Sequence, residues 1–371
     1  MLYRTLLLLL FVAIATNTSA QQLTSVPFDS DRWEIFGDEA EMVTYKGKSS
    51  FFAKQSGAIL KDANFKNGTI TFNIAVPEQR AFPGVYFRME NDNNYEEFYI
   101  RPHQSGNPDA AQYTPVYNGI TGWQLYHGPG FSGQMSYEFD VWMPAKIVIR
   151  GDEADIFVND LEKPLIHVND LKRDPISGAL GLRGTPEGVY FSDFKYSTDA
   201  PAPLVGSSEE EKQADANTIT QWAVSAAFNE ADLAKKTMLG KAHRQDQKWK
   251  PYKTEPSGLL NLAQTAVRSD ETNTVFAKVN INSDSEQIQK LTIGFSDRAK
   301  IYLNGQILFG GQDGFRSRDY RYLGTIGYFD DVYLPLKAGD NELIIAVSEN
   351  FGGWGLQAKF ESTTGISWSA R

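Results

Sequence analysis

The chain has 371 residues, enough for two domains, and a formal net charge of −10 at pH 7. The negative charge argues against nucleic acid and anionic lipid as partners, and it favours neutral sugars or cationic ligands. The chain contains no cysteine, which excludes disulfides, thiolate metal sites and cysteine nucleophiles.

The N-terminus has the pattern of an export signal. Arg4 precedes an apolar run from Leu6 to Ala15, and small residues follow up to Ala20. An apolar run of about ten residues is too short to cross a bilayer, which takes about twenty. We therefore predict a signal peptide over residues 1–20 and a periplasmic or secreted protein with no membrane span; an uncleaved N-terminal anchor is the alternative.

Residues 21–198 alternate short apolar–polar runs with turn sequences such as Asn67-Gly68, and no long amphipathic helix is evident. Strands are predicted at residues 49–60, 69–76, 84–90, 95–103, 145–150, 155–158 and 189–196. Regularly spaced short strands between turns are typical of a sandwich or a barrel.

A Pro-rich and then charged segment, residues 199–217, has almost nothing to bury and is predicted to be a linker. The β pattern resumes over residues 218–371, with a short helix expected at 230–239. Strands are predicted there at residues 274–280, 291–295, 299–303, 331–336, 341–348 and 356–360. The predicted fold class is all-β, with two β-sandwich (jelly-roll) domains joined by a short linker.

Period-two alternation defines a candidate polar patch in the first domain. In the run that begins at Tyr95, Phe98 and Ile100 share one face, and the opposite face carries Tyr95, Glu97, Tyr99, Arg101 and His103. In the preceding run, Val85, Phe87 and Met89 share one face, and the opposite face carries Tyr86, Arg88 and Glu90. If the two runs pair as a hairpin, their polar faces merge.

A predicted loop at residues 112–118, which includes Tyr117, and Trp123 are expected to rim this patch. Aromatic rings would stack on sugar rings, and Arg88 and Glu97 would hydrogen bond to hydroxyl groups. A solvated sheet face with ordinary cross-strand ion pairs is the alternative.

Several segments of the first domain together resemble the concanavalin A-like lectin/glucanase sandwich. They are Gly84-Val85-Tyr86-Phe87-Arg88, Tyr95 to Ile100, Ala145 to Gly151, Gly178 to Leu182 and Val189 to Phe194. Laminin-G-like modules and the bacterial 3-keto-disaccharide hydrolase-like domain share the closing pattern. The resemblance implies a sugar site on the concave face of the sheet.

The second domain resembles galactose-binding-like jelly rolls. The resemblance is carried by Ile219 to Ser225, Leu291 to Asp297, Ala299 to Gly305, Leu334 to Ile345 and Gly352 to Gly355. Such domains bind sugars in some proteins and brace a neighbouring domain in others, and both roles stay open. Trp354 between glycines is the candidate sugar-stacking residue, with Arg316, Arg318, Asp319 and Tyr320 from predicted loops beside it.

The sequence does not decide whether this protein is an enzyme. Retaining glucanases of the resembled fold carry Glu, Asp and Glu at alternate positions of a strand, whereas the nearest match here, Glu138-Phe139-Asp140-Val141-Trp142, ends in Trp. The second carboxylate of that mechanism is therefore missing. A 3-keto-disaccharide hydrolase-like reaction needs one base and one stabilising cation, for which Glu97 or His103 and Arg88 or Arg101 are the candidates.

No cofactor is required by these patterns. The oxygen-rich run Asn91 to Asn94 is a candidate calcium site or a plain turn, and the four histidines do not form a zinc motif. The leading hypothesis is an exported protein that binds a carbohydrate or polysaccharide. The alternatives are a glycoside-active enzyme of the 3-keto-disaccharide hydrolase-like type and a non-catalytic structural or protein-interaction module.

Overall fold

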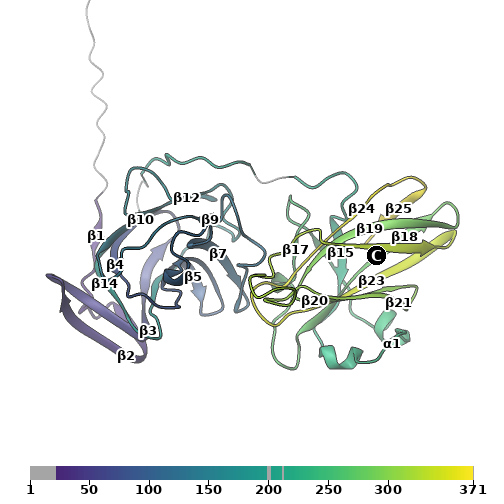
Figure 1. Cartoon of the computed structure of the whole chain (residues 1–371), viewed down its shortest axis with the longest axis horizontal. Coiled ribbons are helices and arrows are strands. Elements are labelled where there is room, and N and C mark those ends of the chain that lie inside the picture. Colours follow the sequence, from purple (N-terminus) through teal and green to yellow (C-terminus); the bar gives the residue numbers. More distant parts are fainter. Residues whose placement is uncertain (1–21, 199–201, 211–212, 371) are drawn as a thin grey trace, which may run out of the picture.

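The computed structural model describes residues 22–198, 202–210 and 213–370, which form two β-domains side by side (Figure 1). The first sheet system runs from Thr24 to Ser197 and the second from Gln221 to Ser369. The prediction of an all-β, sandwich-type fold is confirmed. The predicted signal peptide, residues 1–20, lies outside the described residues. None of the helices in the described part of the chain is long and apolar enough to cross a membrane.

The first domain is one large antiparallel sheet that closes over its own core. Its strand order is β12-β11-β10-β4-β14-β3-β13-β5-β6-β7-β8, with β1, β2 and β9 attached at the sides. The elements are β1 (Thr24–Ser25), β2 (Trp33–Tyr45), β3 (Lys48–Phe65), β4 (Gly68–Ala75), β5 (Gly84–Asn91), β6 (Asn94–Ile100), η1 (Pro102–Gln104), β7 (Ala111–Tyr117), β8 (Ile120–Thr121), β9 (Ser132–Gly133), β10 (Met143–Arg150), β11 (Glu153–Val158), β12 (Ile166–Val168), β13 (Gly178–Arg183) and β14 (Val189–Ser197).

The core of the first domain lies between strands that are distant in the sheet order. Phe72 of β4 and Ile147 of β10 belong to the same buried cluster as Val85 of β5 and Phe98 of β6. Each such side chain stabilises the fold by about 1.5–3 kcal/mol when it leaves water. Since Phe98 and Ile100 point into this core, the alternate residues of β6 lie on the opposite face of the sheet.

The second domain consists of two antiparallel sheets packed face to face. Their strand orders are β16-β15-β18-β23-β20-β21, to which β25 is added, and β17-β24-β19-β22. The elements are β15 (Gln221–Val224), η2 (Glu230–Leu233), α1 (Lys241–Arg244), β16 (Lys250–Lys253), β17 (Leu260–Asn261), η3 (Leu262–Gln264), β18 (Thr274–Ser283), β19 (Gln287–Ser296), β20 (Arg298–Leu303), β21 (Gln306–Gln312), β22 (Asp330–Leu336), β23 (Gly339–Ser348), β24 (Gly355–Phe360) and β25 (Ile366–Ser369).

The helix predicted at residues 230–239 is wrong beyond its first turn. Only Glu230–Leu233 forms a helical turn, of the 3-10 type, which Asn229 caps by accepting a hydrogen bond from the Ala231 amide. Lys235 then takes a left-handed backbone conformation with φ of 60°, which no continuing right-handed helix allows.

Residues 205–209 of the predicted linker lie against the first domain, and residues 214–217 are bonded to the second. The backbone amides of Val205 and Gly206 donate to Asp155 Oδ2 at 2.6 and 3.0 Å, and Asn169 of the first domain donates to Ser208 O. Asp155 is fully buried and also contacts His167 Nδ1 at 2.6 Å. Residues 205–209 are therefore held beside β11 and the end of β12.

Gln124 joins the two domains directly. Its backbone amide donates to Gly352 O at 2.9 Å, and its backbone carbonyl accepts from Ile326 N at 2.9 Å. Its side chain donates to Leu323 O at 2.9 Å and accepts from Ser296 Oγ at 3.2 Å. Gln124 is fully buried, so these bonds fix two loops of the second domain against the end of the first.

Candidate functional site

A cavity of about 660 Å³ lies between the two domains, and we call it the interdomain pocket. Its size falls within the usual range for small-molecule sites, roughly 300–1,000 Å³. The first domain contributes Arg80, Phe82, Glu97, Tyr99, Arg101, His103, Gln104, Asn107, Asp109, Thr121, Trp123 and Arg183. The second domain contributes Phe315, Arg316, Tyr320, Arg321, Leu323 and Phe351.

Arg101 forms the centre of a buried polar wall. Its guanidinium donates to Tyr99 Oη at 2.7 Å and to the carbonyl of Asp109 at 2.6 Å, and it also bonds Gln112 Oε1. Gln112 in turn accepts from Tyr99 Oη at 3.0 Å and donates to the Trp123 carbonyl at 2.9 Å. These bonds fix the guanidinium of Arg101, whose side chain is only 7% exposed, before any ligand arrives.

Glu97 and Arg183 form an ion pair in the floor of the pocket. The Glu97 side chain is 2% exposed and that of Arg183 is 31% exposed. Burial raises the pKa of Glu97, while the positive charge of Arg183 opposes that rise. Arg183 also donates to the Phe82 carbonyl at 2.6 Å, so both partners are held in place.

His103 lies just beyond the end of β6, in the 3-10 turn η1. Its ring packs edge-on against Phe82, with 5.2 Å between the ring centroids. Burial lowers the pKa of His103, and the positive charges of Arg80 and Arg101 add to that effect. The imidazole is therefore favoured in its neutral form, which can accept a proton or a hydrogen bond.

Aromatic rings from both domains meet on one side of the pocket. The ring centroid of Trp123 lies 6.2 Å from that of Phe315 and 5.7 Å from that of Phe351. Phe351 and Tyr320 expose 56% and 76% of their surface. Large exposed aromatic rings beside fixed polar groups are suited to ligands that have both apolar faces and polar edges.

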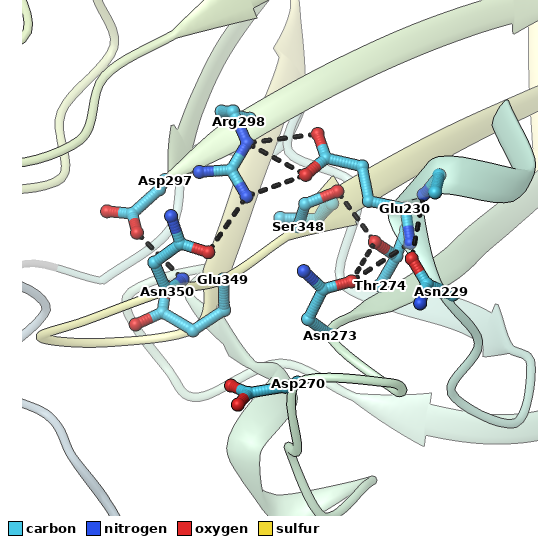
Figure 2. Close-up of polar contacts among 12 residues, drawn as sticks. Asn229, Glu230, Asp270, Asn273, Thr274, Asp297, Arg298, Ser348, Glu349 and Asn350 are labelled. Carbon is cyan, nitrogen blue, oxygen red and sulfur yellow. Dashed lines mark hydrogen bonds and ion pairs between the residues drawn. The ribbon is translucent and has the colours of Figure 1, made fainter. Parts of the chain in front are cut away.

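Buried carboxylates support the second-domain loops of the pocket (Figure 2). Asp297 Oδ2 accepts hydrogen bonds from the amides of Asn350 and Phe351 at 2.9 and 3.2 Å, and its backbone carbonyl accepts from Asp313 N at 2.7 Å. Glu349 Oε1 accepts from Gly353 N at 3.0 Å. Burial and the neighbouring charge of Asp297 raise the pKa of Glu349 to about 8.

An ion pair flanks these carboxylates. Arg298 donates to Glu230 Oε1 at 2.9 Å and Oε2 at 2.7 Å, and to Asn350 Oδ1 at 3.1 Å (Figure 2). Arg298 thus links the 3-10 turn η2, which contains Glu230, to the loop that carries Phe351.

The placement of Arg88 in the polar patch is wrong. The pairing of β5 with β6 changes register between Phe87 and Asn91, and Arg88 has a left-handed φ of 48°. This bulge moves the alternation by one residue, so Met89 clusters with Tyr86 and Arg88 turns inward. Arg88 is fully buried and donates to the Lys66 carbonyl at 2.7 Å, so it does not line the pocket.

Tyr86 and Tyr95 lie behind the pocket, not in its lining. Their ring centroids are 4.6 Å apart, and the Arg183 guanidinium lies 5.9 Å from the Tyr86 ring. Both rings therefore support the Glu97–Arg183 pair from the sheet surface. Tyr117 lines a separate cavity of about 420 Å³, and its hydroxyl bonds the Lys172 carbonyl. The loop predicted around Tyr117 is the strand β7.

The prediction of Trp354 as a sugar-stacking residue is wrong. Its ring is fully buried in the core of the second domain, and its Nε1–H donates to the Val347 carbonyl at 3.0 Å. Gly352 and Gly353 take φ values of 106° and 152°, which let the chain turn sharply enough to direct the indole inward. The exposed ring of this loop is Phe351.

The turn from Asn91 to Asn94 is closed by its own side chains. Asn91 Oδ1 accepts from Asn93 N at 3.0 Å, and Asn94 Oδ1 accepts from Asn118 N at 3.1 Å. These are the hydrogen bonds of an ordinary asparagine turn, and calcium binding here stays a prediction. In the part of the chain that the structure describes, no cluster of three or more His, Cys, Asp or Glu side chains is arranged to hold a metal ion.

Arg316 and Tyr320, which the sequence analysis placed beside Trp354, line the pocket, whereas sequence reasoning missed Arg183, Arg80 and the other second-domain residues of the lining. A signal for Arg183 exists, because Leu182 lies in the core and the next residue must then face the other side of β13. Phe315 and Phe351 have no comparable signal, since their position depends on how the domains pack.

Comparisons with known proteins yield structural neighbours only. No family model matches the chain, and no curated protein matches it. Carbohydrate-binding module CBM66 from Bacillus subtilis is 14% identical, with a TM-score of 0.34 over 45% of this chain and 96% of that one. Galectin LEC-6 from Caenorhabditis elegans is 15% identical, with a TM-score of 0.28 over 40% of this chain and 95% of that one.

A third neighbour is a native glycosidic hydrolase, which is 12% identical, with a TM-score of 0.34 over 49% of this chain and 98% of that one. At these identities and TM-scores, the neighbours assign neither a ligand nor an activity to this chain. We therefore infer a function from the residues that line the interdomain pocket.

Proposed function

We propose that this protein binds a carbohydrate in the interdomain pocket. The observation that carries the proposal is the joining, in one cavity of about 660 Å³, of exposed aromatic rings and fixed polar side chains from two domains. Sugars present apolar C–H faces and polar hydroxyl edges, and the pocket offers a partner for each.

The aromatic surface would contact sugar faces through Trp123, Phe351 and Tyr320. The polar wall would contact hydroxyl groups through Arg101, His103 and Asp109. Arg101 is bonded to the Asp109 carbonyl, and the His103 ring packs against Phe82. Prearranged groups lose little entropy when a ligand binds, which favours affinity. The predicted signal peptide is part of the same proposal, because it would bring the pocket to environmental polysaccharides.

The test is a broad glycan screen with the full chain, followed by calorimetric titration of the best ligand. Tyr320→Ala removes a ring that is 76% exposed, and we expect affinity to fall about tenfold, the loss of roughly one stacked ring. Tyr333→Ala is the matched control, because Tyr333 is 63% exposed on β22 and lies outside the pocket lining.

Binding by no glycan in the screen would contradict the proposal and favour a structural or protein-interaction module. Equal losses of affinity in Tyr320→Ala and Tyr333→Ala would place the ligand elsewhere on the protein.

Glycoside chemistry in the same pocket is a second candidate, favoured by Glu97. Glu97, a buried carboxylate with a raised pKa, and His103, a histidine with a lowered pKa, line the same pocket, and groups of these two kinds transfer protons in active sites. The assay is product release from 3-keto-glycosides by the wild type and by Glu97→Gln. Release by the wild type that survives unchanged in Glu97→Gln would remove Glu97 as the base.

A further inference from the structure

The interdomain pocket has a charge opposite to that of the whole protein. The chain carries a formal net charge of −10. The described residues that line the pocket nevertheless include five arginines against the two carboxylates Glu97 and Asp109. A ligand in the pocket lies close to these arginines, and salt screens the charges of the more distant acidic surface.

The arginines differ in how much of their hydrogen-bonding capacity the protein already uses. Arg101 and Arg183 are bonded to groups in the wall and floor. Arg321 pairs with Asp319 at 3.0 Å but keeps 74% of its side chain exposed. By contrast, the guanidinium groups of Arg80 and Arg316 have neither a hydrogen bond nor an ion pair with any described residue, and each lies over a neighbouring phenylalanine ring.

The two unpaired guanidinium groups come from opposite sides of the pocket. Arg80 belongs to the first-domain loop between β4 and β5, and Arg316 belongs to the second-domain loop between β21 and β22. Each rests on a ring, Phe82 at 5.8 Å and Phe315 at 4.9 Å, which limits its movement without using its N–H donors.

We propose that the ligand is an anionic glycan, one that carries carboxylate or sulfate groups. The inference rests on the proposed carbohydrate binding and adds the charge of the ligand to it. A planar guanidinium donates two parallel hydrogen bonds to a carboxylate or a sulfate, which a hydroxyl group cannot match. Arginines on both domains fit an oligosaccharide with repeated negative charge that lies across the junction.

The test compares three oligosaccharides of equal length with the full-length protein in calorimetric titrations: a neutral one, a uronate-containing one and a sulfated one. We expect at least one anionic oligosaccharide to bind about tenfold more tightly than the neutral one, with an advantage that shrinks as salt is added. Preference for the uronate or for the sulfated ligand identifies which anionic group the pocket recognises.

Arg80→Gln and Arg316→Gln provide the second readout. Each is expected to weaken binding of the anionic ligand about fivefold, in keeping with a partly exposed charge contact, and to weaken binding of the neutral ligand by a smaller factor. Arg150→Gln is the matched control, since Arg150 is exposed at the end of β10 and outside the pocket, so it changes net charge alone.

Two results would overturn the inference and leave carbohydrate binding intact. One is neutral binding as tight as anionic binding; the other is an equal effect of Arg316→Gln and Arg150→Gln on the anionic ligand. Binding of none of the three oligosaccharides, with no hit in the wider glycan screen, would instead refute carbohydrate binding itself and the anionic preference with it.

Discussion

The ion pair between Glu97 and Arg183 shows how one contact shapes the pocket. A carboxylate that is 2% exposed pays a large desolvation cost, which a nearby guanidinium offsets only while the two stay together. Glu97 is thereby both a part of the pocket floor and a potential source of instability. We therefore expect a single substitution of Arg183 and a double substitution of both residues to differ in their effect on the stability of the first domain.

Arg183→Leu should destabilise the first domain by about 2 kcal/mol, because it leaves a buried carboxylate without its partner; the 31% exposure of Arg183 keeps the cost at the lower end for a buried pair. The double variant Glu97→Gln/Arg183→Leu should recover most of that loss. Urea unfolding of both variants and of the wild type measures these changes in the free energy of unfolding. A double variant no more stable than Arg183→Leu would show that the cost comes from lost packing.

At the scale of elements, the two second-domain loops that line the pocket depend on the buried carboxylates beneath them. The loop at residues 313–323 follows β21, and the loop at 349–354 joins β23 to β24. Asp297 binds the first loop through its backbone carbonyl and the second through its carboxylate, and the Glu349 carboxylate also binds the second. The protonation of these carboxylates should therefore influence the stability of the loop at 349–354.

Glu349 has a folded-state pKa of about 8, against an ordinary value of 4.5. The folded protein thus holds a proton that the unfolded chain releases, and stability is full below about pH 4.5 and falls as the pH rises toward about 8. Glu349→Gln removes this titration. At pH 9 the variant should be more stable than the wild type by about 1–2 kcal/mol, and the difference should vanish or reverse at pH 4.

Unfolding of the second domain followed by fluorescence at several pH values tests this prediction. Glu286→Gln, at an exposed turn, is the control and should keep the wild-type profile. Parallel stability profiles for Glu349→Gln and the wild type across this range would show that Glu349 is not the titrating group.

Regular strands could be predicted from alternation, whereas irregular positions could not. Phe98 and Ile100 point into the core, and Glu97 and Tyr99 lie on the other face, because β6 is regular. Arg88 departs from the pattern because a bulge shifts it, and the two glycines before Trp354 direct that ring inward. A pattern of residue types contains no information on where a bulge falls or how a glycine loop turns.

At the scale of the whole molecule, the pocket exists only because two domains meet. Half of its aromatic lining comes from loops of the second domain, and the sequence of one domain does not determine which surface of another will pack on it. For the same reason, the net charge of −10 does not describe the charges that line the pocket. The charges that a ligand meets are those of the junction, where arginines from both domains gather.

Gln124 offers a direct test of this dependence. Gln124→Ala removes the side-chain bonds to Leu323 O and Ser296 Oγ. It leaves the buried Ser296 hydroxyl and the partly buried Leu323 carbonyl without that partner, at a cost of about 1–3 kcal/mol to the interface. Each domain keeps its own core, so both should stay folded while their mutual orientation loosens. We expect glycan affinity to fall about tenfold and the radius of gyration in X-ray scattering to rise.

Gln104→Ala is the matched control, because Gln104 lines the pocket but makes no bond to the second domain in the described part of the chain. If Gln124→Ala keeps full affinity and an unchanged radius of gyration, the domains are held together by other contacts, such as the apolar cluster of Leu125 and Ile326. If affinity falls with no change in the radius, Gln124 acts on the loop that carries Phe351 and not on the orientation of the domains. Only a joint change in both quantities supports a pocket created by domain packing.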